Sequence, residues 1–121
     1  RRLRVSGRTQ MAHALLGSNA FSYEKCRNTV VRLSEKVAST RFNGCTTLSL
    51  ASVAAGQLDI YVARQFKLWD IAAGFLLIKE AGGFVSDFNL NREMGTILKN
   101  QTIIATNMVL KDAVSQIVKG E

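Results

Sequence analysis

The spacing of hydrophobic positions changes along the chain, and each change marks a predicted element. Residues 23–38 carry apolar side chains at steps of four, three and four, which is the spacing of one helical face. Residues 58–63 and 102–106 are short apolar stretches, and β-branched residues dominate the second, as expected of strands. The stretch 71–78 contains no charged or polar side chain, so we expect a helix that is buried on every side.

Polar residues and glycines delimit these segments. Ser22 is placed to cap the first helix, and Asn107 is placed to cap a final amphipathic helix. Gly56 is placed to end a helix of small residues in a left-handed conformation, and the second glycine of Gly82-Gly83 is expected to free the chain for the next strand. Strands and helices alternate, which predicts an α/β fold with a sheet flanked by helices. The remaining predicted segments are a strand or extended entry at 3–8, strands at 15–17 and 84–88, a strand or connection at 40–43, a helix start at 44–47 and a polar turn at 89–95.

The size and composition of the chain suit one domain or part of one. Its 121 residues are 47% hydrophobic, which is enough for a sizeable core. The sequence shows neither an apolar run of membrane-spanning length nor the apolar stretch of a signal peptide. It opens without a methionine, which suggests a piece of a longer protein or a trimmed one. Cys26 and Cys45 fall at apolar helical positions, so we expect small buried side chains in a reducing cytoplasm.

The chain is basic, with a net charge of +7. Such a charge is compatible with an anionic partner, either a nucleic acid or a phosphorylated substrate. The basic residues are nevertheless spread along the sequence, and no aromatic residues interleave with them as a base-stacking surface requires. We therefore favour a solvated basic surface. The basic residues that cluster are Arg1, Arg2, Arg4 and Arg8.

Asp70 stands at the start of the apolar helix, in the sequence W-D-I-A-A-G. Its carboxylate could cap the helix by accepting from backbone N–H groups at the positive end of the helix dipole. Alternatively, it could be one ligand of a divalent cation such as Mg²⁺, which usually takes a few carboxylates together with water and substrate phosphate. One carboxylate cannot hold a catalytic Mg²⁺ alone, and the other acids show no recognisable ligand spacing.

Structural roles suit the other candidate residues. Asp59 and Asp87 are expected at a turn and a strand end, and Glu80 is expected to be solvated or ion-paired. His13 is the only histidine, and we expect it at the surface or a strand edge because no G-x-S-x-G motif accompanies it. Trp69 is expected to be a core aromatic residue that fixes the loop against the sheet.

Residues 43–88 contain G-C-T-T, V-A-A-G-Q-L-D-I-Y, W-D-I-A-A-G and E-A-G-G-F-V-S-D in that order. Together these motifs resemble the C-terminal half of the inositol monophosphatases, most closely their bacterial branch, the extragenic suppressor proteins. Residues 4–8 and 105–107 resemble further segments of the same half. The resemblance implies an α/β fold of layered helices and a mixed β-sheet. Residues 1–121 are then its C-terminal subdomain, and the upstream metal-binding half is absent.

The resemblance also implies a Mg²⁺-dependent phosphomonoesterase, in which metal ions activate a water for attack on phosphorus. It makes Asp70 a metal ligand that touches substrate hydroxyls, and it makes Thr46 and Gly44 candidate substrate contacts. The family commonly has a glutamate seven residues before the metal aspartate, but here that position is Ala63, whose side chain accepts no hydrogen bond. No catalytic residue is expected within this chain, because the other metal ligands and the water-positioning threonine lie upstream.

Three functions fit these observations. The chain could be half of a cytoplasmic, homodimeric phosphatase for an inositol phosphate or a related sugar phosphate, inactive alone. It could instead be a binding module, because bacterial members are associated with the RNA-synthesis machinery and the charge permits an RNA contact. A non-functional remnant of a truncated gene is the third possibility. We favour the first, which predicts that Asp70→Asn keeps the fold but removes most Mg²⁺-dependent activity of the full-length protein. It also predicts that Ala63→Glu improves discrimination for inositol phosphate over simple phosphate esters.

Overall fold

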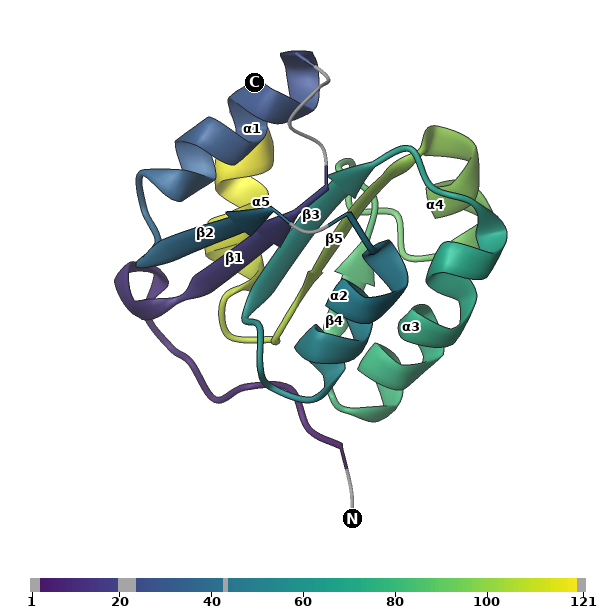
Figure 1. Cartoon of the computed structure of the whole chain (residues 1–121), viewed down its shortest axis with the longest axis horizontal. Helices are drawn as coiled ribbons and strands as arrows, with labels where there is room; N and C mark the ends of the chain where they lie inside the picture. Colours follow the sequence, from purple (N-terminus) through teal and green to yellow (C-terminus); the bar gives the residue numbers. More distant parts are fainter. Residues whose placement is uncertain (1–2, 20–23, 43, 120–121) are drawn as a thin grey trace.

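Five strands form one mixed sheet in the computed structural model, which describes residues 3–19, 24–42 and 44–119 (Figure 1). The strand order is β2-β1-β3-β5-β4. β1 runs parallel to β2 and to β3, whereas β5 runs antiparallel to β3 and to β4. The strands are β1 (Leu15–Ser18), β2 (Ser39–Phe42), β3 (Ile60–Arg64), β4 (Phe84–Ser86) and β5 (Thr102–Thr106).

Helices cover both faces of this sheet, which confirms the predicted α/β layers. α2 and α3 lie together on one face and α1 and α5 on the other (Figure 1). Alternation along β3 divides the core: Tyr61 and Ala63 pack with α2 and α3, while Val62 packs with α1 and α5. The helices are α1 (Glu24–Ser34), α2 (Thr46–Ala54), α3 (Leu68–Glu80), α4 (Met94–Asn100) and α5 (Lys111–Lys119), with a short 3₁₀ turn at Met11–His13.

The predicted helix caps are confirmed at two of the positions that the structure describes. Gly56 has φ +77° after α2, and the Asn107 side chain accepts a hydrogen bond from the Leu110 backbone N–H at 2.8 Å before α5. The predicted cap Ser22 lies outside the described residues. After α3, Gly82 rather than Gly83 takes the left-handed conformation, with φ +84°. Gly83 has a different role, because a Cβ atom there would lie 2.6 Å from the Ile78 side chain.

Element boundaries differ from the prediction in several places. β3 begins at Ile60 rather than 58 and β4 ends at Ser86 rather than 88, and two helices differ more. α1 ends at Ser34 rather than near residue 38, because the Ala38 N–H donates to the Ala14 carbonyl at 3.0 Å and the chain must leave the helix to reach it. The predicted turn at 89–95 is wrong beyond residue 93, where α4 begins. This helix has seven residues and includes Gly95, so its sequence carries a weak helical signal.

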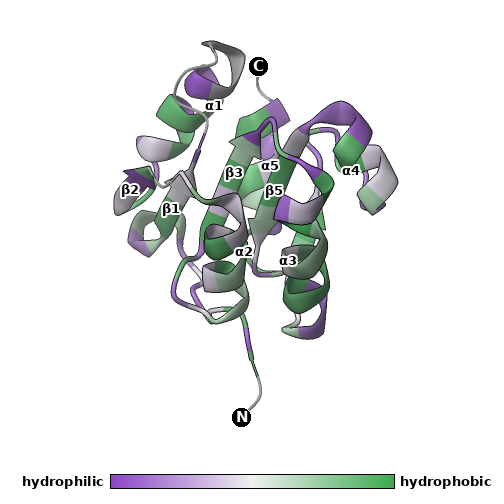
Figure 2. Cartoon of the chain, turned by 45° about the vertical axis from the view of Figure 1, so that its right-hand side comes forward, coloured by the Kyte–Doolittle hydropathy of each residue, from purple (hydrophilic) through white to green (hydrophobic). Residues whose placement is uncertain are grey.

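The prediction that α3 is buried on every side is wrong. Ile71, Gly74 and Ile78 face the sheet and α2, but Trp69 is 74% exposed and Leu76 is 59% exposed. Figure 2 shows that the middle turns of α3 are hydrophobic. The prediction of Trp69 as a core residue is therefore also wrong. In the described part of the chain, nothing covers this outer surface.

The prediction for Cys45 is wrong as well. The residue occupies the N-cap position of α2 with extended backbone, and it is exposed. It therefore precedes the helix instead of sharing its apolar face. The side chain of Cys26 lies outside the part of the chain whose side chains the structure describes.

Candidate functional site

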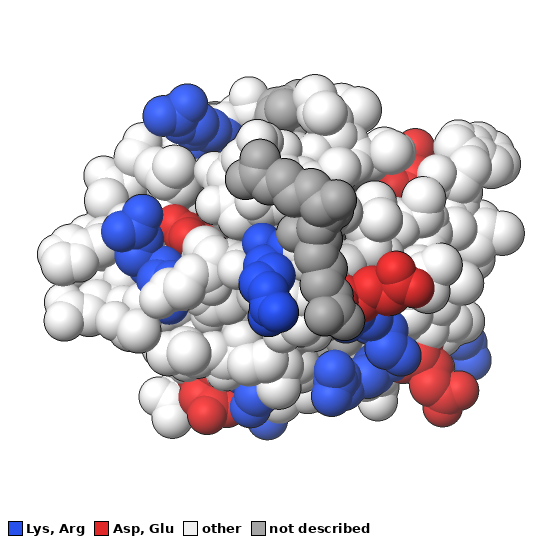
Figure 3. All heavy atoms as spheres, turned by 90° about the horizontal axis from the view of Figure 1, so that it is seen from below, with Lys and Arg blue, Asp and Glu red and all other residues white. Residues whose placement is uncertain are grey.

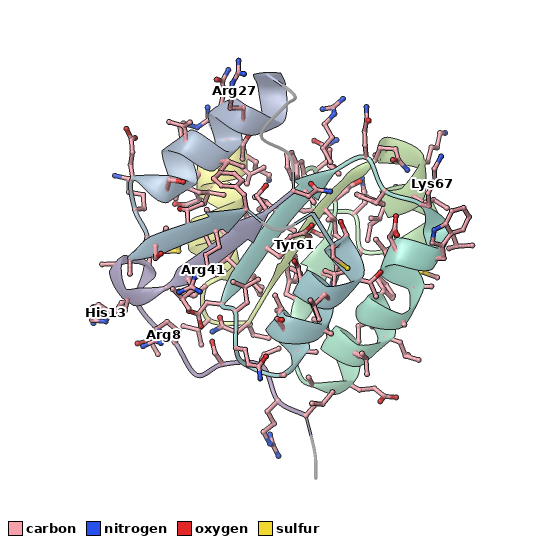
Figure 4. All side chains as sticks on the ribbon, viewed as in Figure 1. Arg8, His13, Arg27, Arg41, Tyr61 and Lys67 are labelled. Atoms are coloured by element: carbon pink, nitrogen blue, oxygen red, sulfur yellow. The ribbon has the colours of Figure 1, made fainter. Side chains whose placement is uncertain are left out.

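The ends of β1 and β3 meet the start of α2 at one edge of the sheet. Asn19, which follows β1, donates from its side chain to the Thr46 hydroxyl at 3.1 Å and accepts from the Arg64 backbone N–H at 3.3 Å. The Thr46 hydroxyl also shares a hydrogen bond of 2.9 Å with the buried Tyr61 hydroxyl. Figure 4 shows Tyr61 between the sheet and α2. This network fixes the first turn of α2 relative to the carboxyl ends of the strands.

Asp70 lies in the first turn of α3 and is half-buried. Its Oδ2 atom accepts from the Lys67 backbone N–H at 2.7 Å, and its own N–H donates to the Lys67 carbonyl at 3.0 Å. The carboxylate therefore caps the helix from inside its first turn. Among the described residues, no hydrogen bond or ion pair engages Oδ1. Capping thus leaves one carboxylate oxygen for a cation or a hydroxyl.

The starts of α2 and α3 are tied directly to each other. The Thr47 hydroxyl donates to the Asp70 carbonyl at 3.1 Å. The two helices pack closely because Gly74 faces Leu50, where a Cβ atom would lie only 2.5 Å from the Leu50 Cβ. The structure therefore brings Asp70 to the same edge as two other candidate residues from the sequence, Thr46 and the exposed Gly44.

The remaining candidate, Ala63, lies near the end of β3 but is 0% exposed. Its methyl group packs in the core shared with α2 and α3. A longer side chain there must displace core residues before it reaches the sheet edge.

A hollow of about 670 Å³ with a mixed polar and apolar lining opens beside Asp70. The loop between β3 and α3 forms one wall, and Gln101 holds this loop: its carbonyl accepts from the Gln65 N–H at 3.1 Å and its side chain accepts from the Phe66 N–H at 2.9 Å. Sequence reasoning missed Gln101, because its left-handed φ of 59° at a residue other than glycine has no sequence signal. The lining residues are Arg64, Gln65, Phe66, Lys67, Asp70 and Gln101.

The described residues of this chain do not by themselves assemble a magnesium site. No group of three or more His, Cys, Asp or Glu residues in the described ranges could hold a metal ion. Mg²⁺ prefers octahedral oxygen coordination, and Asp70 offers at most one carboxylate. Asp59 is occupied elsewhere, since it accepts from the Leu15 N–H at 2.7 Å and pairs with Arg8 at 3.6 Å. The residues present therefore fit part of a Mg²⁺ site and not a whole one.

Asp87 is a buried carboxylate with a structural role, as predicted. Burial opposes its ionisation, but hydrogen bonds from the Asn91 and Asn100 side chains and from the Asn91 and Asn89 backbones outweigh that cost and lower the pKa of Asp87 below 3.8. These bonds connect the turn after β4 to the last turn of α4. Glu80 is exposed, also as predicted.

The face at the amino ends of the parallel strands carries no continuous basic patch among the described residues. Figure 3 shows Lys and Arg side chains separated by neutral and acidic ones. Arg8 pairs with Asp59, and His13 is exposed at this end, as predicted (Figure 4). Arg1 and Arg2 lie outside the described residues. None of the described helices has the length and hydropathy to cross a membrane.

Comparisons with known proteins agree with this architecture. A model of the inositol monophosphatase family matches residues 2–120. An inositol-1-monophosphatase of Mesorhizobium japonicum is 39% identical and aligns with 98% of this chain and 46% of its own length. The Nus factor SuhB of Pseudomonas aeruginosa is 40% identical over 88% of this chain and 41% of its own.

A solved structure gives the same result. The extragenic suppressor protein SuhB of Bartonella henselae superposes with a TM-score of 0.90 at 30% identity, over 98% of this chain and 47% of that chain. The fold described above matches the C-terminal half of such structures. The chain therefore spans about half the length of the relatives it matches.

Proposed function

Because the chain belongs to the inositol monophosphatase family, we propose that it is the C-terminal half of a Mg²⁺-dependent phosphomonoesterase. In this proposal residues 1–121 form the C-terminal subdomain, and an upstream half supplies the remaining metal ligands. The substrate is an inositol phosphate or a related sugar phosphate. One observation carries the proposal: Asp70 is held by the Lys67 N–H through one carboxylate oxygen and keeps the other for a cation.

In this proposal the first turn of α2 binds the substrate. The Thr46 hydroxyl is already engaged by Asn19 and Tyr61, so it acts by fixing the backbone. The N–H groups at the start of a helix donate readily to anionic oxygens, and Gly44 leaves this approach open because its position carries no side chain. Thr46 and Gly44 thus contribute through the main chain rather than through side-chain contacts.

The isolated chain is expected to be inactive, because a single carboxylate does not support a metal-activated water. The complete protein is expected to be a cytoplasmic homodimer, as the family resemblance implies. Mg²⁺-dependent release of phosphate from inositol 1-phosphate by the full-length protein tests the proposal. Loss of that activity in Asp70→Asn, with an unchanged circular dichroism spectrum, supports it; turnover close to that of the unmodified protein contradicts it.

A role in the RNA-synthesis machinery is the second candidate function. It is favoured by the 40% identity to a protein named a Nus factor and by the net charge of +7. The separated charges in Figure 3 count against an RNA contact on that face. RNA affinity that falls steeply with salt, together with no metal-dependent turnover of the full-length protein, favours this second function.

The mass of the native product in its source cells separates the phosphatase function from a binding role of this half alone and from a truncated-gene remnant. Capture with an antibody to this segment, followed by intact mass spectrometry, is the measurement. A product about twice as long as these 121 residues means that the upstream half exists. A product of this length alone excludes catalysis and leaves a binding role or a remnant.

A further inference from the structure

A second cavity lies on the face of the sheet that α5 covers. Its volume is about 420 Å³, within the range of roughly 300–1,000 Å³ that is typical of small-molecule sites. Its floor is formed by the last residue of β3, Arg64, and the first residue of β5, Thr102, and its walls by the end of α5 and the turn after β4. Because α3 packs on the other face of the sheet (Figure 1), this α5-side cavity is separate from the hollow beside Asp70.

The alternation of side chains along β3 assigns Arg64 to the α5 side. Ala63 packs with α2 and α3, whereas Val62 packs with α5 on the opposite face. Arg64 pairs with Thr102 across β3 and β5, and side chains of directly paired residues share a face. The Thr102 hydroxyl accepts from the Phe88 N–H at 3.0 Å, and both of these residues line the α5-side cavity. Arg64 borders both spaces as the last residue of its strand, but the strand directs its side chain toward α5.

The described residues that line this cavity include two cations and no acid. Arg64 is half-buried, and Lys119 at the end of α5 is exposed. Within the described ranges, the Arg64 guanidinium has no ion pair and no hydrogen bond. Carbonyl oxygens at the end of α5 partly offset Lys119, so Arg64 is the principal group for an anion. Asp87 does not line the cavity, and hydrogen bonds already satisfy both of its oxygens.

One segment connects this cavity to the loop before Asp70. Asn100 and Thr102 line the cavity, and Gln101 between them accepts from the N–H groups of Gln65 and Phe66 at 3.1 and 2.9 Å. The same loop begins directly after Arg64. A ligand that draws the Arg64 side chain toward α5 therefore acts on the backbone that positions Asp70.

The lining suits a phosphate group with polar substituents. A guanidinium can donate two parallel hydrogen bonds to a phosphoryl group, and the Lys119 ammonium adds a point charge. The carboxamides of Asn89 and Asn100 add polar groups at the rim. Phe88, the one aromatic residue among the described lining, packs against the core on the α5 side, so the cavity is not a stacking site for a nucleobase.

We propose that the α5-side cavity is an anion site for free phosphate or a small phosphate ester, and that its ligand acts as an effector and not as a substrate. The effect passes to the loop before Asp70 through Arg64 and through residues 100–102. This effector role rests on the proposed phosphatase function. The anion site itself does not, because it needs neither a metal nor turnover.

The binding test is a titration of the ¹⁵N-labelled 121-residue chain with inorganic phosphate, without Mg²⁺ and at constant ionic strength, followed by NMR. We expect saturable shifts at the backbone amides of residues 64, 88, 89, 102 and 119, with smaller shifts at residues 65, 66 and 101. Arg64→Gln should raise the Kd about tenfold and Lys119→Gln about threefold. Lys67→Gln is the matched control, because it removes the same charge from the hollow beside Asp70 and should leave the Kd unchanged.

Four results would overturn the anion site. They are the absence of saturable shifts, shifts confined to other residues, an unchanged Kd in Arg64→Gln with the fold intact by circular dichroism, and an equal loss of affinity in Lys67→Gln, which would place the phosphate beside Asp70. A single-stranded oligouridylate that shifts these amides where phosphate does not would also overturn it, in favour of a nucleic-acid surface.

The effector role is tested by phosphate inhibition of the full-length enzyme acting on inositol 1-phosphate. Phosphate bound only at the catalytic centre competes with substrate and leaves kcat unchanged, whereas phosphate in the α5-side cavity should lower kcat. Lys119→Gln should raise the phosphate concentration needed for this effect about threefold and leave kcat without phosphate unchanged. Purely competitive inhibition would refute the effector role. Absence of any phosphatase turnover in the unmodified protein would refute the proposed function instead, while the NMR result on the anion site stands.

Discussion

The backbone N–H of Lys67 donates to Asp70 Oδ2 at 2.7 Å, while the backbone N–H of Asp70 donates to the Lys67 carbonyl at 3.0 Å. This reciprocal pair gives Asp70 two separable tasks. One oxygen stabilises the start of α3, and the other is left for chemistry. Substitutions at this one position can therefore distinguish the capping role from the proposed metal role.

Asp70→Asn should preserve most of the cap, because a carboxamide oxygen also accepts from an N–H group. Asp70→Ala should lower the free energy of unfolding of this chain by about 1 kcal/mol. Urea unfolding followed by circular dichroism measures both, and Asp112→Ala, in the exposed first turn of α5, is the control. Equal stability of the Asn and Ala variants would show that the cap contributes nothing.

Asp87→Ala should cost about 3 kcal/mol, because it leaves the buried donors of Asn91 and Asn100 without their acceptor. The pKa of Asp87 is lower in the folded chain than its ordinary 3.8, so its contribution is complete above that pH and disappears as the pH falls through the folded value. Urea unfolding at pH 7 and at several values below pH 4 should show the variant and the unmodified chain converging in acid. A constant difference across that range would contradict the ionised role.

Gly74→Ala should destabilise the chain by about 1–3 kcal/mol despite the higher helix propensity of alanine, because its Cβ must enter space held by Leu50. Gly95→Ala in α4 is the matched control: nothing lies within 4 Å of its Cβ, so it should stabilise by about 0.5–1 kcal/mol. Thermal and urea unfolding measure both. Leu50→Gly removes the Leu50 Cβ that the new methyl group meets, so combined with Gly74→Ala it should cost less than the sum of the two single substitutions. Full additivity of the two substitutions would mean that the close contact is not the cause.

The outer surface of α3 should be dispensable for folding of this chain. Trp69→Gln and Leu76→Gln remove exposed apolar side chains and should change the free energy of unfolding by less than about 0.5 kcal/mol. Ile78→Ala, on the buried side, should cost about 3 kcal/mol. We also expect the two glutamine variants to reduce concentration-dependent self-association in sedimentation velocity, since large exposed apolar surfaces promote it.

Because Trp69 is the only tryptophan, its fluorescence reports whether the outer surface of α3 is exposed to solvent. In the isolated chain its fluorescence should be red-shifted and readily quenched by iodide. A blue-shifted, protected emission would mean that self-association already covers the surface at the concentration used.

Local sequence patterns were sufficient to predict the alternation of strands and helices, the caps at Gly56 and Asn107, and the structural role of Asp87. These features depend on the spacing of apolar residues, on turn-forming residues and on near neighbours in sequence, all of which can be read from the amino-acid sequence. The importance of Asp70 was also visible in sequence, because a lone carboxylate before an uncharged helix is unusual. Its capping bond confirms one of the two roles left open there.

Only the tertiary structure decided which apolar residues are buried and which polar residues meet. The apolar composition of α3 predicts a helix buried on every side, yet Trp69 and Leu76 are exposed. Burial depends on what packs against each side of a helix. The hollow of Arg64, Lys67 and Gln101 joins β3, the start of α3 and the end of α4 through left-handed backbones that carry no sequence signal. Such a site arises from contacts between segments distant in sequence, and those contacts exist only once the sheet and its helices have packed.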